Sequence, residues 1–182
     1  MTRFRFEKTL QAAACLLRLE PSRSMSYMRL LKLLYIADRE SLKETGAPVT
    51  GDRVVAMKQG PVLSETYELI KGEHLRYAEW ERAFKREGYR IELVEDPGIG
   101  RLCKYEIDKL NEISEKYREA DEWDMVNVTH EFPEWKKNDP GGSSMKPIPL
   151  KDILKAVGRA GDQQAIEEEE AAGEFITRVL GN

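Results

Sequence analysis

The chain has 182 residues, of which 41% are hydrophobic and 34% are charged, a composition typical of a folded globular protein. A chain of this length can bury a core without disulfides or a metal ion, so we expect Cys15 and Cys103 not to form a structural framework. The sequence has no apolar run near the about 18 residues that a membrane span requires, and no signal-peptide pattern. We therefore expect one cytoplasmic domain over residues 1–182, and the composition argues against secreted scaffolds, membrane proteins and zinc ribbons.

The formal net charge of −4 is divided unevenly, because residues 1–91 carry +5 and residues 92–182 carry −9. A basic first half can attract phosphate, but its Lys and Arg residues are interleaved with acids, as on an ordinary solvated face. We therefore expect no nucleic-acid partner. The acidic second half includes the run Glu167–Glu170. It is either a docking surface for a basic protein partner or an ordinary solvent-exposed face.

Two helices are predicted first. Apolar residues recur at helical spacing over residues 4–19, and a second helix spans residues 26–46, with Ser26 as its N-cap and Gly46 at its end. The centre of the second helix is apolar almost all round, which predicts that it lies inside the domain.

Residues 53–58 then predict a short strand. The pair Gly60-Pro61 predicts a sharp turn, and because proline suits the first helical position we expect a helix over residues 61–71. A weaker helix pattern covers residues 75–85.

A β-hairpin is predicted from residues 89–94, which alternate as a half-buried strand does, and residues 101–107, across the turn residues 96–98. Together with residues 53–58 they would form an antiparallel sheet of about three strands. Asp108 is expected to cap the helix that follows.

Further helices are expected from Asp121 to His130, near residues 150–157 and over residues 163–180. Residues 138–144 are rich in Gly, Ser and Pro and predict a loop. The expected fold is therefore α+β, mainly helical, with a helical core and one small antiparallel sheet.

The sequence carries no recognisable catalytic or metal-binding motif. His74 and His130 lie 56 residues apart, and a proline breaks the helical register between His130 and Glu134, the nearest candidate metal pair. No P-loop, nucleophile elbow or dinucleotide fingerprint occurs. We therefore expect no enzyme activity, no metal and no cofactor.

Polar residues on the apolar second helix are the main candidates for recognition. Lys32, Tyr35 and Arg39 follow at i, i+3 and i+7 and therefore share one face, which can serve as a recognition face. In the alternative interpretation, Asp38 and Arg39 form internal ion pairs or caps.

Two further pairs leave the same alternatives open. Ser64 and Tyr67 are either exposed binding groups or a first-turn hydroxyl and an aromatic residue at the edge of the core. His130, close in sequence to Trp135, is more typical of a buried, hydrogen-bonded histidine than of a functional one.

Several of these motifs occur in a fixed order along the chain: residues 32–40, Thr50-Gly51-Asp52, Ala56-Met57, Gly60-Pro61-Val62, Ser64, Tyr67, Thr129-His130 and Pro133-x-Trp135. This series resembles the Panacea domain of SocA-like antitoxins. The resemblance covers nearly the whole chain, is dense from about residue 27 to residue 70, and is weak after residue 140. It implies structural roles for the family-motif residues Lys32, Asp38, Gly51, Asp52, Gly60, Pro61, His130 and Trp135.

The resemblance implies an antitoxin that neutralises a toxin encoded beside it through direct protein contact. Toxins of this family include translation-blocking enzymes similar to small alarmone synthetases and membrane-acting peptides, and related domains occur in prophages. One family member resembles a proteolytic adaptor that delivers its toxin to a ClpXP-type protease, so adaptor activity is one alternative and a DNA-binding regulator is another.

No catalytic residue carries over from the family. We predict that the toxin-binding surface includes Tyr35, Arg39, Lys58, Ser64 and Tyr67, and that residues beyond about 140 contribute to the choice of partner.

Overall fold

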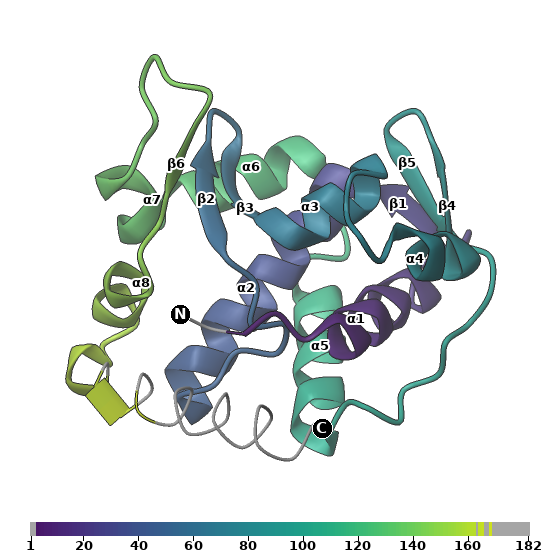
Figure 1. Cartoon of the computed structure of the whole chain (residues 1–182), viewed down its shortest axis with the longest axis horizontal. Helices are drawn as coiled ribbons and strands as arrows, with labels where there is room; N and C mark the ends of the chain where they lie inside the picture. Colours follow the sequence, from purple (N-terminus) through teal and green to yellow (C-terminus); the bar gives the residue numbers. More distant parts are fainter. Residues whose placement is uncertain (1–2, 163, 166–167, 169–182) are drawn as a thin grey trace.

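The computed structural model describes residues 3–162, 164–165 and 168, and confirms a mainly helical α+β fold (Figure 1). The helices are α1 (Phe6–Arg18), α2 (Tyr27–Thr45), α3 (Ser64–Lys71), α4 (Tyr77–Ala83), α5 (Lys104–Lys116), α6 (Glu122–His130), α7 (Pro133–Lys137), α8 (Leu150–Ala156) and the 3-10 turn η1 (Ala160–Asp162). The strands are β1 (Ser24–Ser26), β2 (Val54–Met57), β3 (Gly60–Leu63), β4 (Phe84–Glu87), β5 (Arg90–Leu93) and β6 (Met145–Pro147). The expected final helix over residues 163–180 lies outside the described residues, apart from 164–165 and 168.

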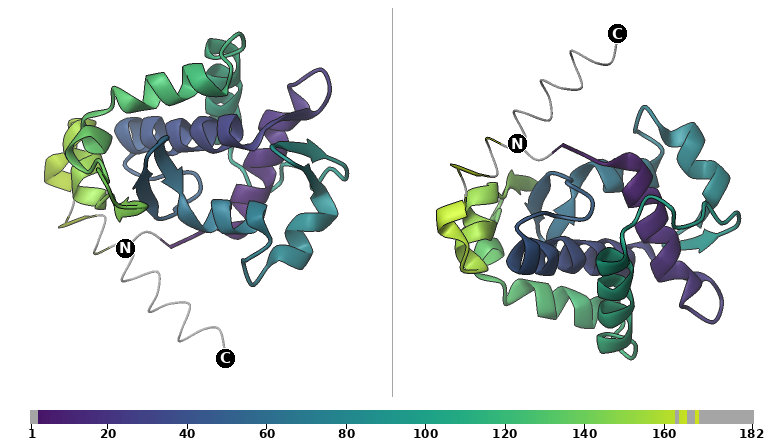
Figure 2. Two further views of the ribbon diagram at one scale, coloured as in Figure 1. Left: turned by 90° about the horizontal axis from the view of Figure 1, so that it is seen from above. Right: turned by 90° about the horizontal axis from the view of Figure 1, so that it is seen from below.

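Helix α2 is the centre of the molecule, as its apolar sequence predicts. Residues 29–38 are all buried, and α1, α5, α6 and β3 pack against the helix from different sides. Figure 2 shows α6 running beside α2. The helix begins after Ser26, as expected, and ends at Gly46, which adopts the left-handed conformation with φ 81°. The burial of α2 explains why the few polar side chains on it must all find partners inside the protein.

One three-stranded antiparallel sheet has the strand order β3-β2-β6. The expected helix over residues 61–71 was wrong at its start, because residues 60–63 form strand β3 and pair with β2, with Gly60 opposite Met57. The helix begins only at Ser64. The carboxylate of Asp52 accepts the backbone N–H groups of Glu65 and Thr66, which gives the first turn of α3 its capping partner from a distant residue.

A second three-stranded antiparallel sheet has the order β1-β5-β4 and lies on the opposite side of the molecule from the first (Figure 1). The hairpin was predicted with the wrong partner, because residues 90–93 pair with residues 84–87 and not with residues 101–107. Residues from Lys104 onward are helical, and the Glu106 carboxylate accepts the N–H of Cys103 at the start of α5. Asp108 therefore lies inside α5 and does not cap it.

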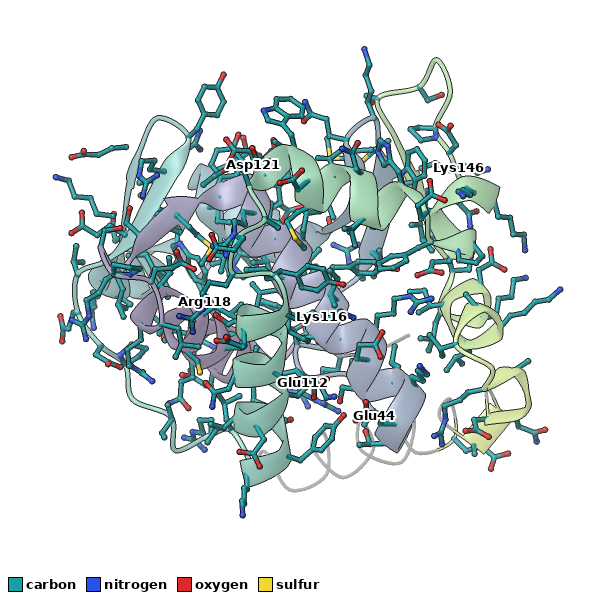
Figure 3. The ribbon with its side chains drawn as sticks, turned by 180° about the vertical axis from the view of Figure 1, so that it is seen from behind. Glu44, Glu112, Lys116, Arg118, Asp121 and Lys146 are labelled. Atoms are coloured by element: carbon teal, nitrogen blue, oxygen red, sulfur yellow. The ribbon has the colours of Figure 1, made fainter. Side chains whose placement is uncertain are left out.

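A buried lysine joins α5 to the end of α2. Lys109 Nζ donates to Glu44 Oε1 at 2.8 Å and to Glu112 Oε2 at 2.6 Å, and the two acids lie on neighbouring helices in Figure 3.

The predicted helix after Asp121 is confirmed as α6, and the Asp121 side chain accepts the N–H groups of Trp123 and Asp124. Arg29, near the start of α2, donates from Nε to the carbonyl of Ala120 at 2.9 Å, which holds the N-terminal end of α6 beside the start of α2, where the candidate site lies.

Candidate functional site

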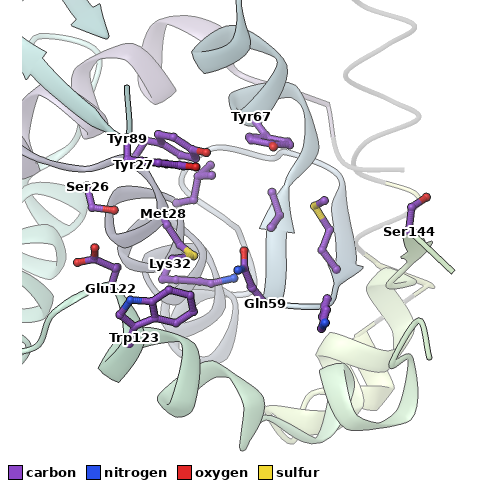
Figure 4. A pocket seen from close by; sticks show the side chains of 14 residues that line it. Ser26, Tyr27, Met28, Lys32, Gln59, Tyr67, Tyr89, Glu122, Trp123 and Ser144 are labelled. Atoms are coloured by element: carbon purple, nitrogen blue, oxygen red, sulfur yellow. The ribbon is translucent and has the colours of Figure 1, made fainter. Parts of the chain in front are cut away.

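A pocket of about 410 Å³ opens between the first turns of α2, the β2–β3 turn, α3 and the start of α6 (Figure 4). Residues distant in sequence meet there, since the wall is made by residues 26–28, 57–59 and 122–123, and by Tyr67 and Tyr89. We call this cavity the tyrosine pocket.

Aromatic rings form one side of the tyrosine pocket. The ring of Tyr27 lies 6.3 Å from that of Tyr67 and 6.1 Å from that of Tyr89, centre to centre. Two cations lie over these rings, because the Arg86 guanidinium is 4.9 Å from the centre of Tyr27 and the Lys71 amine is 4.9 Å from the centre of Tyr67. Such contacts hold the rings in place and make their surroundings electropositive.

The opposite edge carries an exposed indole. Trp123 is 55% exposed and Tyr89 is 78% exposed, although large aromatic side chains are usually well covered in a folded protein. Both belong to the tyrosine pocket. Exposed aromatic residues around a concave apolar surface are typical of sites that bind a partner.

The amine of Lys32 lies at the inner end of the tyrosine pocket (Figure 4). Lys32 is only 1% exposed, and its Nζ donates to the carbonyl of Pro61 at 2.8 Å. Burial lowers the pKa of this amine to about 7. An ammonium group has three donors, so the observed hydrogen bond leaves donor capacity at this position.

Gly60 and Pro61 allow the lysine amine to approach the backbone. Gly60 has φ +100°, and a methyl group added at this position would lie 2.9 Å from Lys32 Nζ and 2.8 Å from Thr129 Oγ1. Any larger residue would therefore displace the amine or the threonine.

His130 lies behind the β2–β3 turn and is stacked on Trp135, with ring centres 3.9 Å apart. The Trp135 Nε1–H donates to the carbonyl of Met57 at 3.2 Å, which joins α7 to the hairpin. Burial, and secondarily the charge of Lys32, lowers the pKa of His130. Its Nε2 is buried and has no hydrogen-bond partner in the described part of the chain.

A second cavity of about 330 Å³ lies between α2 and residues 147–150. Two residues of its wall donate hydrogen bonds to Glu134 Oε1, Tyr35 from Oη and Arg39 from Nε, both at 2.7 Å. The guanidinium of Arg39 also lies 4.3 Å from the ring centre of Phe132. The Glu134 side chain is fully buried, and its hydrogen bonds join α7 to the middle of α2.

Two buried aspartates anchor the segment that follows α2. Asp38 accepts hydrogen bonds from the N–H and the hydroxyl of Thr50, and Asp52 accepts two backbone N–H groups and the hydroxyl of Thr66. Burial is the main cause that raises the pKa of Asp38 to about 7 and that of Asp52 to about 6. Between them, Gly51 has φ +66°, and an added methyl would lie 2.3 Å from a backbone oxygen.

Comparison with protein families identifies this arrangement of elements and motifs. The family model described as antitoxin SocA-like, Panacea domain, matches residues 30–136. The chain belongs to this family. The match extends from α2 to α7 and includes Lys32, both buried aspartates and Trp123. No curated protein and no solved structure matches the chain.

The Panacea domain brings together only some of the residues predicted to bind a toxin. Lys58 and Tyr67 line the tyrosine pocket, whereas Tyr35 and Arg39 line the second cavity. Ser64 begins α3 and lines neither of them. Tyr35 is 1% exposed, so it lies behind the surface and is connected to Arg39 through Glu134, to which both donate.

Sequence analysis missed three aromatic residues of the tyrosine pocket: Tyr27, Tyr89 and Trp123. A signal for Trp123 was present, because it is the second residue of α6, two positions after the N-cap Asp121, on a polar, exposed first turn. Tyr89 lies in the β4–β5 turn, where a large ring is unusual unless a neighbour or a partner covers it, and its side chain is 78% exposed.

Neither a metal site nor a membrane helix was found in the part of the chain that the structure describes. Its His, Cys, Asp and Glu side chains form no group of three or more that could hold a metal ion. None of its helices has the length and apolar character that a membrane-spanning helix needs. Cys15 and Cys103 are both free thiols.

Proposed function

We propose that this Panacea-domain protein neutralises a toxin polypeptide by binding it directly, without carrying out a reaction of its own. The observation that carries the proposal is its membership of the SocA-like antitoxin family over residues 30–136. The tyrosine pocket supports it, because exposed aromatic residues around a preformed cavity provide the anchors that protein interfaces use.

A rigid framework makes such binding effective. The pocket is built on α2, α3, α6 and a two-residue hairpin turn. Hydrogen bonds join these elements, because Arg29 of α2 donates to the carbonyl of Ala120 before α6, Lys32 of α2 donates to the carbonyl of Pro61 in β3, and Asp52 before β2 accepts the N–H of Thr66 in α3. A surface that is already ordered loses less conformational entropy on binding than a flexible one. A complex of ordinary size would bury about 1,200–2,000 Å² in total.

Co-expression with the product of the neighbouring reading frame tests the proposal. We expect that product to stop growth when expressed alone, and growth to recover together with co-purification of a complex when this chain is present. A harmless neighbour, or recovery of growth without a complex, would contradict direct neutralisation.

The half-life of the toxin separates inhibition from delivery to a protease. Direct inhibition predicts an unchanged half-life in cells that have recovered. A half-life that shortens in the presence of this chain, and lengthens again when a ClpXP-type protease is deleted, would assign the adaptor role instead.

A further inference from the structure

We propose that the tyrosine pocket is the toxin-binding site and that it receives an acidic side chain of the toxin, next to an apolar one, with Lys32 as the counter-charge. This inference rests on the proposed function, and it adds the place and the chemistry of recognition.

The apolar part of the inference follows from the shape and lining of the pocket. Its volume of about 410 Å³ lies in the range of cavities that hold a ligand, and Tyr27, Tyr67 and Tyr89 form a continuous aromatic wall. Trp123 stands exposed at the opposite edge. An inserted apolar side chain would contact the rings on one side and the indole on the other.

The acidic part follows from the charges. Lys32 presents its amine at the inner end, and Lys58 lies at the mouth, exposed and without a carboxylate partner among the described residues. Arg86 and Lys71 lie over the tyrosine rings, although Lys71 also pairs with Glu73. The two lysines that line the pocket outnumber its one lining carboxylate among the described residues, Glu122, so an anionic group is favoured there.

A carboxylate fits this site better than a phosphate group does. Phosphate sites use several converging donors, such as a free helix N-terminus or an arginine fork. Here the N-terminus of α6 is already occupied by its own residues, because the Asp121 side chain accepts the N–H groups of the first turn. One inward amine beside aromatic walls matches a single carboxylate on a polypeptide.

The protonation of Lys32 gives the inference a specific signature. The charged or titratable groups around it are His130 from α6, Lys58 from the β2–β3 turn and Glu122 at the pocket edge. Burial lowers the pKa of the free amine to about 7. A toxin carboxylate beside the amine would raise that pKa again, so complex formation at about pH 8 should take up close to one proton.

The test compares the wild-type chain with Lys32→Met, Trp123→Ala and the control Leu75→Ala in complex formation with the co-expressed neighbouring gene product. Leu75 is fully exposed and does not line the tyrosine pocket, so it controls for loss of a surface side chain. We expect the two pocket variants to bind at least about tenfold more weakly and the control to bind normally. Circular dichroism verifies that each variant is folded.

Calorimetry in two buffers of different ionisation enthalpy then measures proton uptake. We expect uptake by the wild type, and none by Lys32→Met where residual binding allows the measurement. Wild-type binding without proton uptake would overturn the contact between Lys32 and an acidic group. Full binding by both pocket variants would overturn the site itself, whereas failure of the wild type to bind would refute the proposed function and this inference with it.

Discussion

Replacement of Lys32 by methionine should make the free protein more stable. Burial lowers the pKa of this amine from its ordinary value of 10.5 to about 7. Each pKa unit corresponds to about 1.4 kcal/mol, so the buried amine costs the native state about 5 kcal/mol when it is fully protonated and about 4 kcal/mol at pH 7, where half of it is neutral. Methionine avoids this cost but leaves the Pro61 carbonyl without its donor, which costs about 1–3 kcal/mol. We expect a net gain of about 2 kcal/mol in the free energy of unfolding.

The pH dependence of that gain is the sharper test. Above about pH 7 the native state has released the Lys32 proton while the unfolded state keeps it, so the wild type gains stability as the pH rises. The advantage of Lys32→Met should therefore shrink by about 1.4 kcal/mol per pH unit and disappear by about pH 9.

Urea unfolding at about pH 7 and about pH 9 measures both quantities. The same substitution at the exposed Lys58 is the matched control and should change the stability by less than about 0.5 kcal/mol at either pH. A Lys32→Met variant that is less stable than the wild type at neutral pH, or equally improved at both pH values, would refute the reasoning.

Three further substitutions test the buried contacts. Gly60→Ala should lower the stability by about 2 kcal/mol or more in thermal unfolding, because the added methyl lies 2.8 Å from Thr129 Oγ1 at a φ of +100°; an unchanged melting temperature would contradict this. Asp38→Asn should leave the stability near pH 4 unchanged and raise it above about pH 7. Between these pH values the native state of the wild type keeps the proton on Asp38 that the unfolded state has lost, which costs the wild type stability. Equal effects of the substitution at both pH values would exclude the buried carboxyl as the cause. Glu134→Gln should destabilise by about 3 kcal/mol in urea, because Arg39 loses its buried anionic partner, and a change below about 1 kcal/mol would show that the network contributes little.

The sequence was sufficient for elements whose signals are local. Helix α2 has an N-cap position, an apolar body and a left-handed glycine at its end, and α6 has a capping aspartate. The start of helix α5 was missed because residues 101–107 alternate between apolar and polar side chains as a strand does. In the structure the helix begins at Lys104, inside that predicted strand. The cap that starts α5 is a carboxylate from its own third residue, Glu106, next to a cysteine that is not a usual N-cap.

The wrong start of α3 has a tertiary cause. Proline after glycine suits a helix start, but residues 60–63 form backbone hydrogen bonds with β2 instead. The helix begins only at Ser64, where Asp52, twelve residues earlier in the chain, caps its first turn. No local pattern encodes that contact. The second sheet was likewise not predictable from local patterns, because β1 is only three residues long and its residues 24–26 pair with residues 90–92 of β5, far along the chain.

The candidate site was only half predictable for the same reason. Lys58 and Tyr67 belong to one contiguous stretch of motifs and were predicted as binding residues, whereas Tyr89 and Trp123 reach the pocket from segments that the fold alone brings together. Lys32, Tyr35 and Arg39 were predicted to share one face of α2, but they line two different cavities. Lys32 lines the tyrosine pocket, and Tyr35 and Arg39 line the second cavity.

Hydrogen–deuterium exchange of the chain alone and in complex with its toxin tests the central claim most directly. We predict that binding protects residues 26–28, 57–59 and 122–123, which surround the tyrosine pocket. Protection confined to residues 147–150 at the second cavity, with these three segments exchanging as in the free chain, would contradict the account.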